Sequence, residues 1–286
     1  MNQSAIYETS IYRLKGWRKW LRYILLIIVS IIFLAPVFWM LSSSLKPEYQ
    51  IFATPPIWWP NPPRWENFTE ALTTLPFGRF AINTLIIAIG SVIGHLISCS
   101  LVAYGFARLE APGKGFLFIL LLSTLMLPYP VTMVPLYIIF SRLGWVNTFL
   151  PLIVPTFLGN AFYIFLLRQA FKQIPPELED AALIDGANFF QILRYVVIPI
   201  SAPALATVAI FSFQAAWNDF LAPLIFLHDQ SKYTLQLGLS FFRGSYTINW
   251  AYIMATSLVV TIPVVIIYFV FQKSFIEGIG YTGTKL

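Results

Sequence analysis

The sequence predicts an all-α integral membrane protein with six transmembrane helices. Of its 286 residues, 58% are hydrophobic and 10% are charged, whereas about a quarter of the residues in soluble domains are charged. A helix needs about 20 apolar residues to cross a bilayer. Six charge-free intervals reach that length, at residues 23–45, 80–107, 115–141, 143–167, 195–218 and 244–272. Each span is expected to be somewhat shorter than its interval, except the fifth, which is expected over 200–226.

Basic residues predict the orientation of these spans. Five of them precede the first interval: Arg13, Lys15, Arg18, Lys19 and Arg22. The positive-inside rule assigns this cluster to the cytoplasm, and alternation then puts both termini and most of the 18 Lys and Arg residues there. The predicted organisation is a cytoplasmic basic segment (1–22), a transmembrane domain (23–272) and a cytoplasmic tail (273–286). A cleaved signal peptide is the alternative for the first span, but its apolar run is too long and no A-x-A site follows.

Cysteine, histidine and charge limit the possible functions. One cysteine excludes an internal disulfide framework, and two histidines are too few for a histidine-rich metal site. His95 and Cys99 are one helical turn apart, yet two ligands alone make a weak metal site. The formal charge of +6 is spread along the chain, so we interpret it as membrane topology and expect no nucleic-acid partner.

An acidic stretch separates the fourth and fifth intervals, within a loop expected at about 169–199. Proline is tolerated in the first turn of a helix, where negative charge is also favoured, so Pro176 predicts a helix over 176–184. Gly186 is placed to end this helix in a left-handed turn. Ala181 and Ala182 would let another backbone come close. The stretch gathers four of the chain's 12 carboxylates: Glu177, Glu179, Asp180 and Asp185.

This stretch resembles the EAA loop of permease subunits in binding-protein-dependent ATP-binding cassette importers. The family pattern is Glu-Ala-Ala, three residues, Gly, nine residues and Ile-x-Leu-Pro; here it reads Asp180-Ala181-Ala182, Gly186 and Val196-Val197-Ile198-Pro199. In the family, the loop forms the coupling helix, which sits in a cleft of the cytoplasmic ATPase. The resemblance implies ATPase coupling by Glu177, Glu179, Asp180, Ala181, Ala182, Asp185 and Gly186. The alternative is an acidic loop helix with no partner.

Further motifs of this family extend the resemblance from Trp39 to Lys285. They are Pro62, Trp65, Asn67 and Phe68 in an outer loop rich in Pro and Trp, residues 103–108 (A-Y-A/G-F-A-R), residues 128–137 (P-x-x-V-x-x-I/V-P-L-Y), residues 143–148 (L-G-x-x-N-T), residues 217–223 (W-N-x-F-x-x-P), residues 233–239 (Y-T-L-x-x-G-L) and the tail from Gln272 to Lys285. In the outer loop, Trp58, Trp59 and Trp65 can anchor in the headgroups, either as a simple interfacial belt or at a partner contact.

Polar and proline residues within the spans predict a translocation path. Three prolines should break the third span, and a broken helix must face protein or water rather than lipid. Asp219 is costly at membrane depth and should be paired or face water. The predicted path or outer gate comprises Gln214, Asn218, Asp219, Asn160, Pro130 and Pro135. A purely structural kink, and an outer-interface charge without a transport role, are the alternatives.

The resemblance, closest to the maltose-type branch, implies an importer of a carbohydrate in a prokaryotic inner membrane. Its implied partners are a second permease, an ATPase dimer that holds ATP and Mg, and an extracytoplasmic sugar-binding protein, alongside membrane lipid. The implied binding-protein contacts are Tyr233, Thr234, Leu235 and Gly238. The chain lacks the pattern G-x-x-x-x-G-K-[ST], so we expect no enzyme activity and no cofactor. An ion-coupled transporter or channel working without an ATPase, and a membrane enzyme, are the other classes considered.

Overall fold

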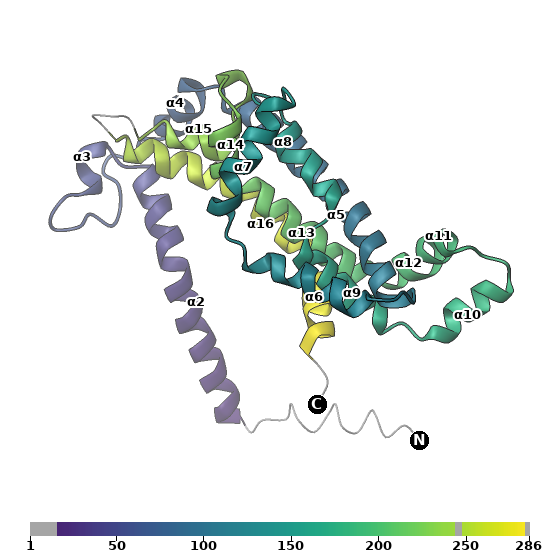
Figure 1. Ribbon diagram of the computed structural model, residues 1–286. Coiled ribbons are helices and arrows are strands. Elements are labelled where there is room, and N and C mark those ends of the chain that lie inside the picture. Colours follow the sequence, from purple (N-terminus) through teal and green to yellow (C-terminus); the bar gives the residue numbers. More distant parts are fainter. Residues whose placement is uncertain (1–15, 244–247, 284–286) are drawn as a thin grey trace. The chain divides into compact units, whose positions relative to one another are not determined.

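The computed structural model describes residues 16–243 and 248–283, and every element within them is a helix (Figure 1). Contacts divide the chain into two compact units. One consists of Met1–Ala71 with Tyr246–Leu258, and the other of Leu72–Ser245 with Val259–Leu286. The boundary between Ala71 and Leu72 falls inside α4, and that between Leu258 and Val259 inside α16.

The first unit contains α2 (Gly16–Ser44), α3 (Glu48–Ile51), most of α4 (Glu66–Thr74) and the first turns of α16 (Trp250–Gly283). The second contains α5 (Phe77–Arg108), α6 (Lys114–Ser123), η1 (Thr124–Met126), α7 (Tyr129–Arg142), α8 (Leu150–Ile153), η2 (Val154–Leu158), α9 (Ala161–Lys172), α10 (Pro176–Ile184), α11 (Phe189–Ile192), the π-helical η3 (Leu193–Val197), α12 (Ile198–Ile200), α13 (Ala202–Trp217), α14 (Leu221–Phe226), η4 (Gln230–Lys232) and α15 (Leu235–Ser240).

Four helical segments are long and apolar enough to cross a membrane, and two bent pairs raise the number to as many as six in the described part of the chain. The four are Lys19–Ser44, Phe77–Arg108, Leu150–Lys172 and Trp250–Gln272. The bent pairs are Lys114–Met126 with Tyr129–Arg142, at 98°, and Phe189–Ile200 with Ala202–Trp217, at 83°. The first bent pair occupies the third predicted span, and the second overlaps the fifth but begins earlier, within the loop predicted at about 169–199.

The third predicted span breaks where its prolines begin. Pro128 has extended backbone and precedes α7, while Pro135 stays inside that helix. The fifth span corrects the expectation of one continuous run over 200–226, because α13 ends at Trp217 and α14 starts at Leu221. Pro223 has no N–H to donate to the carbonyl four residues earlier, and Asp219 Oδ1 instead accepts the N–H of Ala222 at 3.2 Å.

In the first unit, Asn67 of the Pro62, Trp65, Asn67 and Phe68 motif holds the Pro- and Trp-rich loop in place. The side chain of Asn67 donates to the carbonyls of Ser44 and Lys46 at 2.9 and 3.0 Å. Glu48 accepts the first N–H groups of α16, from Trp250 and Ala251, at 3.0 and 3.2 Å. A carboxylate is favourable at a helix N-terminus. This loop is therefore built around hydrogen bonds, with short helices at both ends.

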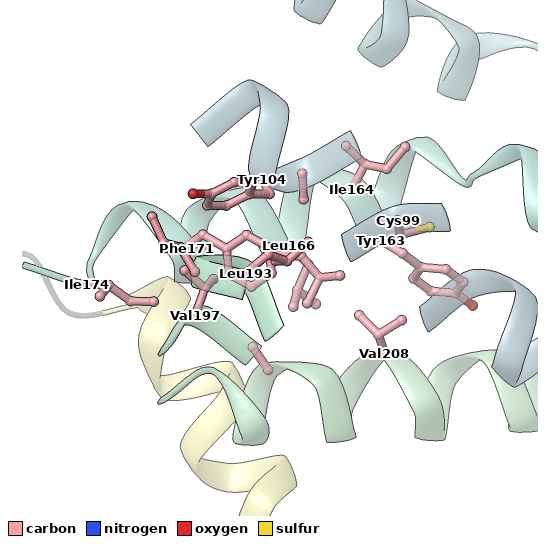
Figure 2. Packing of buried hydrophobic residues seen from close by; sticks show 14 residues of the cluster. Cys99, Tyr104, Tyr163, Ile164, Leu166, Phe171, Ile174, Leu193, Val197 and Val208 are labelled. Carbon is pink, nitrogen blue, oxygen red and sulfur yellow. The ribbon is translucent and has the colours of Figure 1, made fainter. Parts of the chain in front are cut away.

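In the second unit, α5 packs against α9 and α13. Figure 2 shows the buried core that they share with α11 and η3, including Phe171, Leu193 and Val208. Close packing of α5 depends on two glycines. A Cβ on Gly94 would lie 2.1 Å from Thr156 Oγ1, and one on Gly90 would lie 2.9 Å from Ile153 Cγ2. The small-residue pair therefore meets the fourth span, as small pairs do between membrane helices.

Candidate functional site

The acidic loop forms the helix that the sequence predicts, α10 (Pro176–Ile184). Gly186 follows it with φ of +83°. The N–H of Ala187 donates to the carbonyl of Ala182 at 2.9 Å, and that of Gly186 to Leu183 at 3.0 Å. This pair of bonds is a Schellman motif, which needs a left-handed residue and so favours glycine. The chain is thereby turned back towards α11.

Most of this acidic helix is open to solvent or a partner. Figure 1 shows α10 on a loop that projects from α9 and α11. Glu177, Asp180 and Asp185 are exposed. Exposed apolar side chains accompany them, including Leu183 (47%) and Ile184 (87%). An exposed apolar patch rimmed by polar groups marks an interaction surface, and we call this patch the α10 outer face.

Glu179 points the other way and is buried. Its Oε1 lies 2.6 Å from Arg108 Nε at the end of α5, and the hydroxyl of Tyr104 donates to its Oε2 at 3.2 Å. Arg108 also donates from Nη2 to the carbonyl of Ile174 at 2.5 Å. These three side chains therefore join α10 to α5, and we call them the α5–α10 clamp.

Removing either ionic partner of the clamp should cost considerable free energy. The Arg108 and Glu179 side chains are only 17% and 11% exposed. Removing one partner of a buried ion pair leaves an uncompensated charge and typically costs about 3–5 kcal/mol. The clamp therefore fixes the acidic helix to the end of α5 in this structure.

Sequence reasoning missed the clamp. It counted Arg108 among the cytoplasmic basic residues and grouped Glu179 with the carboxylates assigned to ATPase coupling, whereas the Glu179 side chain is buried. One signal was available, since Tyr104 and Arg108 are four residues apart and so share a face of α5. Their partner could not be deduced, because it lies on a different segment.

The predicted path residues do not all meet in one place. Gln214 and Asn218 are exposed on α13 and at its end, and Pro130 and Pro135 are exposed on α7. The side chain of Asn160 caps α9 by accepting the N–H groups of Phe162 and Tyr163 at 3.0 and 3.3 Å. Asp219 lines a cavity with four other polar side chains, described below. A shared path for the six residues stays a prediction.

The predicted binding-protein loop packs largely inward. Thr234 and Leu235 are 2% and 5% exposed, and a Cβ on Gly238 would lie 2.4 Å from Phe80 Cδ2. The ring of Tyr233 is half-buried and stacks on Phe241 with centroids 5.3 Å apart. Three of the four residues therefore shape the loop from within, and a direct binding-protein contact stays a prediction.

The same loop is attached near the N-terminal end of α5. The side chain of Asn83 donates to the carbonyls of Ser231 and Tyr233, both at 2.9 Å. The N–H of Leu235 donates to Thr84 Oγ1 at 2.9 Å. With 32 residues at 1.5 Å each, α5 is about 48 Å long. One helix therefore holds the acidic loop at its C-terminal end and the predicted binding-protein loop near its N-terminal end.

Asn147 also holds the predicted binding-protein loop through hydrogen bonds. Its φ is +61°, which asparagine tolerates better than most residues. Its Oδ1 accepts the N–H groups of His228 and Asp229 at 3.2 and 3.1 Å, and Lys232 donates to its carbonyl at 2.6 Å. This is the asparagine of the L-G-x-x-N-T motif, so the motif has a structural role here.

A family model for the binding-protein-dependent transport system inner membrane component matches residues 97–279. The chain belongs to this family. The matched region contains α10, Gly186 and both ionic partners of the α5–α10 clamp. Members of this family are transport permeases rather than enzymes. Among the described residues of this permease, no group of three or more His, Cys, Asp or Glu side chains could hold a metal ion.

Full-length relatives and solved structures agree with this assignment. This permease is 36% identical to a probable ABC transporter permease protein of Pyrococcus horikoshii, over 90% of this chain and 95% of the relative. It is 33% identical to the diacetylchitobiose uptake system permease protein NgcG of Streptomyces coelicolor (87% and 83% covered). It is also 33% identical to the trehalose/maltose transport system permease protein MalG of Thermococcus litoralis (88% and 92%).

Among solved structures, the fold is similar to a chain in the crystal structure of a bacterial ABC transporter involved in the import of the acidic polysaccharide alginate. The TM-score is 0.78 at 25% identity, over 89% of this chain and 95% of the other. The helical architecture of the permease is thus that of an ABC importer subunit.

Proposed function

We propose that this chain is the transmembrane permease subunit of an ABC importer for carbohydrates. A second, related permease would complete the path, and an extracytoplasmic binding protein would deliver the sugar. A partner ATPase pair on the cytoplasmic face would hold ATP and Mg and supply the energy. Several relatives are named for diacetylchitobiose or trehalose/maltose transport, which supports a saccharide substrate. The protein would lie in a prokaryotic inner membrane with both termini in the cytoplasm.

The observation that carries the coupling role is the clamp beneath an exposed acidic helix. The α10 outer face presents Asp180, Asp185 and Ile184 to a partner, while Glu179 ties the same helix to Arg108. A force applied to the outer face therefore passes into α5. An acidic helix that was merely solvated would have no need of a buried ion pair behind it.

From the clamp, movement can reach the rest of the unit through packed contacts. The core shared by α5, α9, η3 and α13 is closely packed, and Phe171 and Val208 are fully buried in it. Close-packed interiors transmit strain because they do not compress. At its N-terminal end, α5 would shift the predicted binding-protein loop through the hydrogen bonds of Asn83 and Thr84. A movement of the ATPase that displaces α10 would thus be transmitted to both sides of the membrane.

Uptake by the reconstituted complex tests this proposal. The chain is co-expressed with its partner permease, ATPase and binding protein, and radiolabelled maltose, trehalose and diacetylchitobiose are offered to proteoliposomes. We expect uptake of at least one sugar that requires both ATP and the binding protein. Uptake driven by an ion gradient without the ATPase would support the ion-coupled alternative and contradict the proposal.

A further inference from the structure

A polar cavity lies in the second unit, apart from the acidic loop. Its volume is about 170 Å³. Three parts of the chain line it: α5, the segment of α8 and η2, and α13 with the start of α14. Its polar side chains are Ser91, His95, Thr156, Ser212 and Asp219.

The cavity brings together two ionisable side chains from distant parts of the chain. His95 is the one histidine within the six apolar intervals, and Asp219 directly follows the fifth. They are far apart in sequence, and both line this cavity. Ionisable side chains at membrane depth mark substrate pathways by default, because their burial in lipid is costly. Their meeting at one cavity is a stronger indication than either residue alone.

Helical spacing explains how the cavity forms. On α13, Ser212, Ala215 and Ala216 are spaced i, i+3 and i+4, so they share a face, and Asp219 follows just after the helix ends. The two alanines leave space in front of that face. Ala215 is exposed, so the cavity reaches the surface of this chain.

The hydrogen bonds of the lining leave room for a ligand. His95 Nδ1 lies 2.7 Å from Ser212 Oγ, which leaves its second ring nitrogen to donate or accept. Asp219 Oδ1 accepts the N–H of Ala222, and a carboxylate has about four acceptor sites. Ile87, Leu152 and Pro223 add apolar surface to the walls. The cavity therefore combines strong acceptors, hydroxyl groups and an apolar wall.

We propose that this cavity is a subsite for one uncharged saccharide unit on the translocation path. Sugar hydroxyls would donate to Asp219 and exchange hydrogen bonds with His95 and Ser212, and the apolar walls would face the C–H surface of the ring. The Asp219 carboxylate would repel an acidic sugar. The cavity has the volume of about five or six waters in the liquid. This volume suits one sugar ring of an oligosaccharide. This proposal rests on the proposed function.

Protection of an engineered cysteine tests the subsite. Ala216→Cys places a thiol in the cavity, and Ala209→Cys, which lines a different, apolar pocket on α13, is the matched control. The single native cysteine, Cys99, is fully buried, so the wild-type protein supplies the background. The complete transporter with its binding protein is labelled with a methanethiosulfonate-ethylammonium reagent. The transported neutral disaccharide is present or absent.

We expect the sugar to slow labelling of Ala216→Cys several-fold and to leave Ala209→Cys unchanged. Failure to protect Ala216→Cys, in vesicles that still import the sugar, would overturn the subsite but leave the proposed function standing. Asp219→Asn provides a second test. Loss of a hydrogen bond to a charged group should raise the half-saturating sugar concentration about tenfold. It should also let a uronic-acid disaccharide compete, and an unchanged preference would contradict the proposal.

Discussion

Arg108 and Glu179 form an ion pair of 2.6 Å between the end of α5 and the acidic helix α10. The pair lies behind the α10 outer face, and Tyr104 adds a hydrogen bond to the same carboxylate. Two motifs of the family, the end of the second span and the acidic loop, are therefore parts of one structural element. On the proposed coupling role, force received by one of them would be delivered to the other.

Replacing Glu179 with Gln should uncouple the transporter. The change leaves Arg108 without its buried counter-charge, a loss of the kind that typically costs about 3–5 kcal/mol. We expect uptake per ATP hydrolysed to fall by about tenfold or more, while ATP hydrolysis itself continues. Paired measurements of sugar uptake and phosphate release in proteoliposomes give this ratio.

Glu177→Gln is the matched control, because Glu177 is an exposed carboxylate of the same helix. Its uptake ratio should stay within about twofold of the wild type, as expected for the small effects of most surface substitutions. Equal losses in both variants would show that acidity of the loop matters and the clamp does not. Exchanging the charges, with Arg108→Glu and Glu179→Arg together, should restore part of the ratio.

Gly186→Leu should disturb the end of α10. Gly186 has φ of +83°, and an ordinary side chain in the left-handed region costs about 1–2 kcal/mol. Gly186→Asn is the matched variant, since asparagine tolerates this conformation. We expect the Leu variant to insert normally but to lose most uptake, and the Asn variant to retain it. Equal uptake by the two variants would contradict a conformational role.

Gly94→Ala should destabilise the second unit. The added Cβ would lie 2.1 Å from Thr156 Oγ1, and overpacking of this kind costs about 1–3 kcal/mol. Gly105→Ala in the same helix meets nothing within 4 Å, so it should be neutral or stabilising. Thermal unfolding in detergent measures the difference, and equal Tm values would refute the close approach of α5 to η2.

Asn83→Ala should weaken the attachment of the predicted binding-protein loop (residues 228–243) to α5. The variant loses two hydrogen bonds of 2.9 Å, to the carbonyls of Ser231 and Tyr233, each worth about 0.5–1.5 kcal/mol. Proteolysis of residues 228–243 from the outer side should become several-fold faster. The same cleavage rate as in the wild type would mean that α5 does not hold this loop.

Local sequence rules predicted the acidic helix and its glycine turn, because proline at the start and glycine at the end act within a few residues. The three prolines also predicted a break in the third span, and the structure puts that break at Pro128. The interruption at Asn218 was missed because counting charges finds apolar runs but not helix ends. The clamp and the cavity join residues from different helices, such as His95 and Asp219, and depend on packing that no local pattern encodes.

Cross-linking from the α10 outer face tests the central claim most directly. A photo-reactive amino acid replaces Ile184, which is 87% exposed, in the complete and transport-active assembly, and the cross-linked products are identified by mass spectrometry. We predict that the ATPase subunit is captured, and that the same substitution at Leu158 (85% exposed) in the fourth span does not capture it. Capture of no ATPase from Ile184, or labelling of this position from outside the cell, would contradict the account.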